Sequence, residues 1–120
     1  MAFTVLIVDD VQFMRGMLRS ILEGAGYQVV GEAANGEEAL EQYAELQPDL
    51  VLMDIVMPVM DGLEATERLR RSQPRAKVVI CSAMGQKETV LKAMQAGARD
   101  FIIKPFTPER VLEAVRRGLR

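Results

Sequence analysis

Five charged or polar side chains each follow an apolar stretch of this sequence: the pair Asp9 and Asp10, then Asp54, Ser82 and Lys104. Carboxylates that gather at one point repel one another, and a hard divalent cation with oxygen ligands relieves that repulsion. Mg2+ suits such a site, because it takes one or two carboxylates and keeps other positions for water and phosphate oxygens. The set predicts phosphoryl transfer to Asp54 as the nucleophile, with the metal on Asp9 and Asp10. Lys104 would neutralise charge on the transferred group, and Ser82 would donate a hydrogen bond to it.

Each of these residues also has a purely structural interpretation. Asp10 and Ser82 could cap the helices that follow them, and Asp54 could be a turn residue. Lys104 could point into solvent next to a turn, where Lys104-Pro105 could be a cis peptide bond. Taken together the residues favour a site, because capping does not require a second acid beside Asp10, nor an aspartate after a buried run.

Composition excludes several other kinds of chemistry. The 120 residues include no histidine, which removes serine–histidine and cysteine–histidine catalysis and imidazole metal sites. The single cysteine, Cys81, lies in an apolar run and is expected to be a buried, reduced thiol in a reducing compartment. The pI near 5.2 and net charge of −2 argue against nucleic acid as a partner. We see no secretory signal and no apolar run near the roughly 18 residues of a membrane span, so we expect a cytoplasmic protein without membrane insertion.

The elements that must position these side chains alternate along the chain. Apolar, β-branched runs predict strands at residues 4–8, 28–31, 50–53, 77–81 and 101–103, and helical spacing of apolar residues separates them. This alternation predicts an α/β fold, a doubly wound five-stranded parallel sheet with five helices, and the chain length predicts one domain over residues 1–120. In strand order 2-1-3-4-5 the polar residues converge at the carboxyl ends of adjacent strands, with Asp54 central among them.

Local signals for helix ends agree with this division. Gly26 and Gly97 stand where helices should stop. Asn35 with Glu38 resembles a capping box, and Thr107-Pro108 places proline in the first position of the last helix.

The sequence resembles the receiver domains of two-component response regulators, most closely the stand-alone chemotaxis (CheY) type. The matching motifs are LIVDD at 6–10, VLMDIVMPVMDG at 51–62, CSAMG at 81–85 and DFIIKPF at 100–106. The resemblance implies that Asp54 accepts a phosphoryl group from a phosphohistidine on a separate histidine kinase of the chemotaxis type. It also implies a magnesium site made by Asp9, Asp10, Asp54 and the backbone carbonyl of Val56. Such a protein is a phosphoacceptor switch, which catalyses only its own phosphorylation and dephosphorylation.

The resemblance further implies how the switch works. Ser82 moves toward the phosphoryl group, and Phe101 turns inward into the space that Ser82 leaves. The output is phosphorylation-dependent binding, with a flagellar motor switch protein as expected target, a phosphatase as possible partner and a monomer as expected state. Val56 and Met84 would flank the path of the hydrolytic water, and we expect these apolar side chains to slow loss of the phosphoryl group.

Three other functions remain open. A phosphorelay intermediate, or another single-domain receiver, would have the same active site. A magnesium-dependent aspartyl phosphatase of the haloacid dehalogenase type would need an acid two residues after the nucleophile, where this chain has Val56. A flavodoxin-like flavin carrier would need a phosphate cradle after the first strand, and Asp9 and Asp10 would repel that phosphate.

Overall fold

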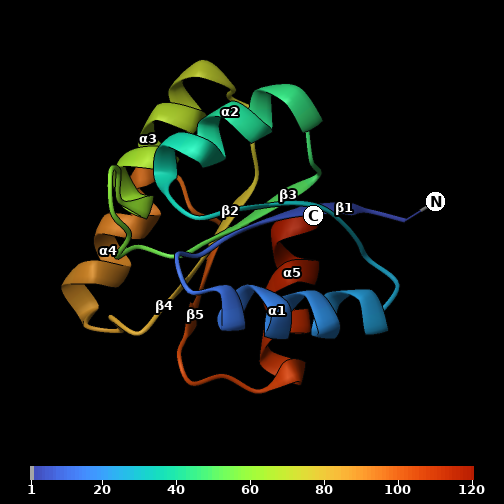
Figure 1. The fold of residues 1–120 in the computed structure, drawn as a ribbon. Helices are drawn as coiled ribbons and strands as arrows, with labels where there is room; N and C mark the ends of the chain where they lie inside the picture. Colours follow the sequence, from blue (N-terminus) through green and yellow to red (C-terminus); the bar gives the residue numbers. More distant parts are fainter. Residues whose placement is uncertain (1) are drawn as a thin grey trace.

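The computed structural model describes residues 2–120, which form five strands and five helices (Figure 1). The strands are β1 (Thr4–Val8), β2 (Gln28–Ala33), β3 (Leu50–Met53), β4 (Val78–Ser82) and β5 (Asp100–Ile103). The helices are α1 (Gln12–Gly24), α2 (Gly36–Leu46), α3 (Gly62–Ser72), α4 (Lys87–Ala96) and α5 (Pro108–Leu119).

All strands are parallel and lie in the order β2-β1-β3-β4-β5, which confirms the predicted sheet. The second strand is longer than predicted, because Glu32 and Ala33 continue the pairing of β2 with β1. The other strands differ from their predicted bounds by no more than one residue at either end. β1 lies between β2 and β3, and the start of β1 is held to the residue before β3 by hydrogen bonds from Thr4 N–H and Oγ1 to Asp49.

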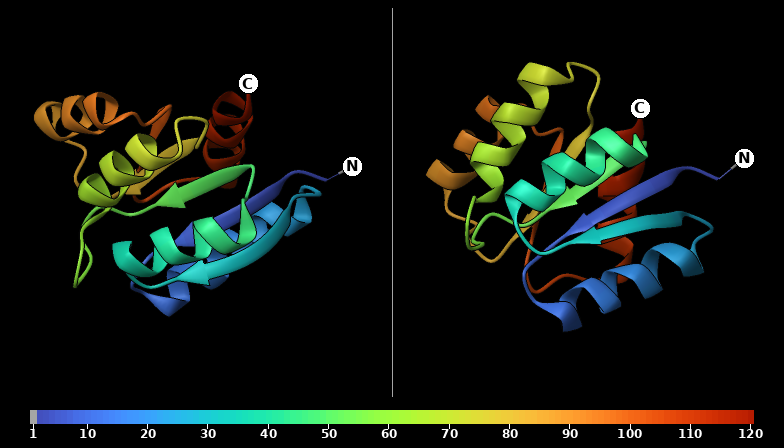
Figure 2. Two further views of the ribbon diagram at one scale, coloured as in Figure 1. Left: turned by 90° about the horizontal axis from the view of Figure 1, so that it is seen from above. Right: turned by 45° about the horizontal axis from the view of Figure 1, so that its top comes forward.

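The sheet separates two layers of helices, as the two views in Figure 2 show. Buried residues of α2, α3 and α4 pack on one face, and buried residues of α1 and α5 pack on the other. Adjacent residues of one strand therefore belong to different cores. On β5, Phe101 packs in the α2–α4 core and Ile102 in the α1–α5 core.

The helix ends follow the predicted signals. Asn35 accepts a hydrogen bond from Glu38 N–H at 2.9 Å, and Thr107 caps α5 in the same way. Gly97, with φ of 110°, ends α4, and Gly26, with φ of 91°, follows the end of α1. Since glycine adopts positive φ without a steric penalty, these two predictions are confirmed.

None of the helices within residues 2–120 combines the length and the hydropathy that crossing a membrane requires.

Candidate functional site

The end of β1 places one buried and one exposed carboxylate side by side. Asp9 is 1% exposed, and its Oδ1 accepts a hydrogen bond from Val11 N–H at 2.9 Å. Asp10 is exposed, and α1 begins after Val11 without a side-chain cap. The capping interpretation of Asp10 is therefore wrong: Asp9 takes the backbone N–H at this turn, and the carboxylate of Asp10 remains available to a ligand.

The end of β3 places Asp54 beside these acids. Its backbone N–H donates to Val8 O at 2.9 Å, which aligns the ends of β3 and β1. Its Oδ1 accepts from Ile55 N–H at 2.7 Å, and the residue is 7% exposed. The close approach of α3 depends on Gly62, whose N–H donates to Ile55 O at 2.8 Å. Asp54 thus lies at the bottom of the site, in a turn that is tied to both β1 and α3.

Lys104 follows β5 and reaches across the ends of the strands. Its Nζ lies 2.7 Å from Asp9 Oδ2 and 3.3 Å from Asp54 Oδ2, and its side chain is 15% exposed. The interpretation of Lys104 as a solvent-exposed lysine is therefore wrong. The Lys104-Pro105 peptide bond is cis, as the sequence allowed.

The three acids come close enough together to share a metal ion. Asp9, Asp10 and Asp54 each offer a carboxylate oxygen, and these oxygens lie within 4.8 Å of one another. Burial raises the pKa of Asp54, Lys104 lowers it less, and Asp9 raises it again. Burial lowers the pKa of Lys104, but its hydrogen bond to Asp9 and the charges of Asp54 and Asp9 outweigh this and raise it. An all-oxygen set with one open, exposed ligand fits Mg2+, which retains water and substrate oxygens in its coordination shell.

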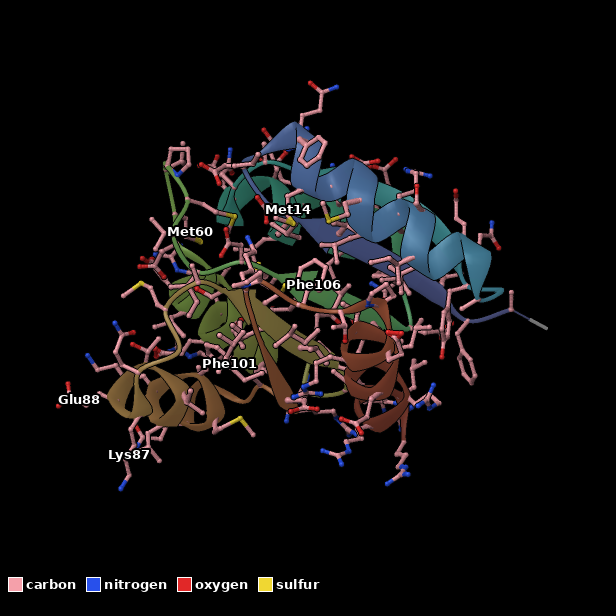
Figure 3. All side chains as sticks on the ribbon, turned by 90° about the horizontal axis from the view of Figure 1, so that it is seen from below. Met14, Met60, Lys87, Glu88, Phe101 and Phe106 are labelled. Atoms are coloured by element: carbon pink, nitrogen blue, oxygen red, sulfur yellow. The ribbon has the colours of Figure 1, made fainter. Side chains whose placement is uncertain are left out.

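Four further residues of the predicted site lie on or just after strands β3, β4 and β5. Ser82 is buried at the end of β4, and its Oγ accepts a hydrogen bond from Met84 N–H at 3.1 Å. It does not cap the next helix, since α4 begins only at Lys87. Val56 and Met84 are 61% and 38% exposed, so both present apolar surface to solvent. Phe101 is 7% exposed and points to the α4 side of the sheet (Figure 3).

One cation close to the acids was not predicted from the sequence. Arg15 of α1 donates to the backbone carbonyl of Asp9 at 2.6 Å and forms an ion pair with Glu32 at 3.0 Å. Arg19 contacts the same Glu32 at 2.7 Å. The opposite charges on α1 and at the end of β2 could have indicated these ion pairs from the sequence. Charge alone, however, does not specify which residues pair.

Comparison with known proteins identifies the family of this arrangement. The response regulator receiver domain model matches residues 5–116. The chain is 56% identical to the chemotaxis protein CheY of Thermotoga maritima, covering 94% of each chain, and 52% identical to CheY of Bacillus subtilis, covering 99% of each. A Borrelia burgdorferi CheX–CheY complex with beryllofluoride and magnesium contains a chain with a TM-score of 0.92 and 36% identity, covering 94% of this chain and 86% of that one. The response regulator domain of Thermotoga maritima CheB has a TM-score of 0.90 and 34% identity, covering 99% and 97%.

Proposed function

This chain belongs to the response regulator receiver domain family, and we propose that it is a chemotaxis-type switch in which a histidine kinase phosphorylates Asp54. The observation that carries the proposal is the ammonium group of Lys104, which lies within 3.3 Å of both Asp9 and Asp54. A phosphoryl group adds about −1.5 to −2 charge, and a cation already seated between the acids offsets it.

The transfer needs one bond to form and one to break. A carboxylate oxygen of Asp54 attacks the phosphorus of the phosphohistidine, the phosphorus–nitrogen bond breaks, and the histidine nitrogen of the donor keeps the electron pair. The donor must come from another protein, since this chain has no histidine. Lys104 stabilises the added charge, and Ser82 donates a hydrogen bond to a phosphoryl oxygen once it has moved toward the site.

Asp9, Asp10 and Asp54, with the backbone carbonyl of Val56, would hold the magnesium ion. When bound, Mg2+ offsets the charge of the acids and of the phosphoryl oxygens. The closeness of the three carboxylates and the exposure of Asp10 support this assignment.

The output of the switch is binding to another protein through surfaces that respond to Ser82 and Phe101. We propose a flagellar motor switch protein as target and the cytoplasm as location, on the strength of the chemotaxis relatives. A phosphatase is a further proposed partner, and the unphosphorylated chain is proposed to be a monomer. Val56 and Met84 are proposed to slow hydrolysis, because neither side chain can orient a water molecule by a strong hydrogen bond.

The proposal is tested by the intact mass of the protein after incubation with acetyl phosphate, with and without Mg2+. We expect one phosphoryl increment that requires Mg2+, is lost in Asp54→Asn, and persists in Asp49→Asn. Asp49 is the matched control, because it is an exposed aspartate at the opposite end of the same strand. An increment that survives in Asp54→Asn, or one that is absent from the parent even after a phosphorylated histidine kinase is supplied, would refute the proposal.

A further inference from the structure

Two charged side chains hold the backbone of Phe101 on the open edge of the sheet. β5 is an edge strand, with β4 as its single neighbour in the sheet. Phe101 N–H donates to Asp100 Oδ1 at 2.8 Å, and Phe101 O accepts from Arg110 Nη2 at 2.8 Å. Both polar groups of this residue are therefore bonded to side chains, one from β5 itself and one from α5.

The two side chains also contact each other. Arg110 Nη2 lies 3.4 Å from Asp100 Oδ1, so the carboxylate, the guanidinium and the Phe101 backbone form one closed group. Asp100 Oδ2 is buried and has no hydrogen-bond partner within residues 2–120. Leaving a carboxylate oxygen unpaired is costly, and Arg110 provides the compensating charge. Because burying this carboxylate is costly, the presence of the Asp100–Arg110 pair on an edge strand indicates that the pair has a function at this position of β5.

The position is next to the switch. Three residues after Phe101, the chain reaches Lys104, whose N–H donates to Ser82 O at 2.9 Å. Phe101 packs on the α4 side, whereas Arg110 belongs to α5 on the opposite side of the sheet. The contact thus ties the backbone of a residue in one core to a helix of the other.

We propose that Asp100 and Arg110 are positioning residues of the switch, which fix the Phe101 backbone to α5 so that the ring responds to the phosphorylated site. This inference rests on the proposed function. A ring can follow a small displacement at Ser82 only if its own backbone stays in place. Without the pair, we expect the Phe101 ring to change position independently of Asp54.

The test compares Arg110→Met with Arg117→Met, both on α5. Arg117 is the matched control, because its side chain is 57% exposed and its ion-pair contact with Glu113 is long, at 3.9 Å. In the first measurement, the amide of Phe101 should exchange with solvent about tenfold faster in Arg110→Met, because the Asp100 carboxylate that accepts this amide loses its contact with the guanidinium and the Phe101 carbonyl loses its donor. Arg117→Met should exchange at the parent rate.

The second measurement follows the ring itself, through fluorophenylalanine incorporation and 19F NMR with beryllofluoride and Mg2+ as phosphoryl mimic. In the parent and in Arg117→Met, the mimic should shift the Phe101 resonance. In Arg110→Met, about half or more of that shift should be lost, although acetyl phosphate still modifies Asp54. Arg110→Lys keeps the positive charge and the N–H donors of an ammonium group, so it should restore part of the shift. That rescue would show that the methionine variant does not fail merely by misfolding.

The possible results distinguish the positioning role of Arg110 from the phosphorylation switch itself. An Arg110→Met variant with the full parental shift would overturn the positioning role and leave the phosphorylation switch intact. A parent whose Phe101 resonance does not respond to the mimic would overturn the switch itself, and this inference with it. A shift lost equally in Arg117→Met would also overturn the inference, because any weakening of α5 would then suffice.

Discussion

Replacing Gly62 by alanine should destabilise this domain by about 3 to 5 kcal/mol, because the start of α3 lies against the backbone of Asp54, the proposed phosphoryl acceptor. A Cβ at position 62 falls 1.8 Å from the carbonyl oxygen of Asp54 and 2.8 Å from its carbonyl carbon. Ordinary contact begins at 3.4 Å, and backbone atoms cannot move aside as a flexible side chain can. The turn between Asp54 and Gly62 must therefore open by more than an ångström.

Three losses make up this magnitude. Overpacking of a close contact costs about 1 to 3 kcal/mol. Opening the turn also weakens the hydrogen bond from Gly62 N–H to Ile55 O, worth about 1 kcal/mol. The same movement disturbs the cap that Asp61 provides to Glu64 N–H, worth about 1 kcal/mol again.

Thermal unfolding is the assay, and Gly16→Ala is the control. A Cβ on Gly16 meets no described atom within 4 Å, and Gly16 is exposed inside α1. Alanine should therefore stabilise that helix by about 0.5 to 1 kcal/mol. At about 4 °C per kcal/mol for a domain of this size, Gly62→Ala should lower Tm by more than about 10 °C and Gly16→Ala should raise it by about 2 to 4 °C. If the Tm of Gly62→Ala stays within about 2 °C of the parent, the close contact does not exist as described.

Three further predictions concern the acid site. Val56→Asn should speed loss of the phosphoryl group several-fold, because an amide can orient the attacking water; an unchanged decay of the intact-mass increment contradicts this. Without Mg2+, Asp54→Asn should be the more stable protein at neutral pH, since burial raises the pKa of Asp54 and the folded state therefore favours the protonated acid. The stability that protonated Asp54 contributes is present in acid and is lost as pH rises through the folded-state pKa. The urea midpoints of parent and variant should therefore converge at low pH. A difference in midpoint that stays the same at every pH would contradict this prediction. Mg2+ at a hundred times its Kd should stabilise the parent by about 2.7 kcal/mol and Asp10→Asn much less, and a flat calorimetric response in the parent would count against the metal site.

Most of the fold could be predicted from the sequence, because buried parallel strands are continuous apolar runs and the helix ends carry local signals. The capping by Asn35 and the stop at Gly97 involve residues only a few positions apart. The edge strand β2 was predicted too short, since Glu32 interrupts its apolar pattern and is instead stabilised by Arg15 and Arg19.

The sequence predicted that Asp9, Asp10, Asp54 and Lys104 come together, but it did not predict their contacts. Topology alone brings Asp9, Asp54 and Lys104 to one edge of the sheet. Topology does not tell whether Asp9 or Asp10 accepts the Val11 N–H, nor whether Lys104 turns inward, because the local turn and the side-chain conformation decide these contacts. The contact of Arg110 with the Phe101 backbone depends on how α5 lies against an edge strand, which no local pattern records.

The pairing of β1 with β3, and the late position of β5 in the chain, determine the order in which the site can assemble during synthesis. Synthesis proceeds from the N-terminus, so Asp9 and Asp10 are made first. Asp54 joins them once β3 pairs with β1, and Lys104 joins the site only after β5 has been made. A nascent chain folded as far as β3 therefore brings together three carboxylates with no ammonium group between them. Such an intermediate should depend on Mg2+ more strongly than the finished domain, so the ion would assist the folding of this chain before it serves phosphoryl transfer.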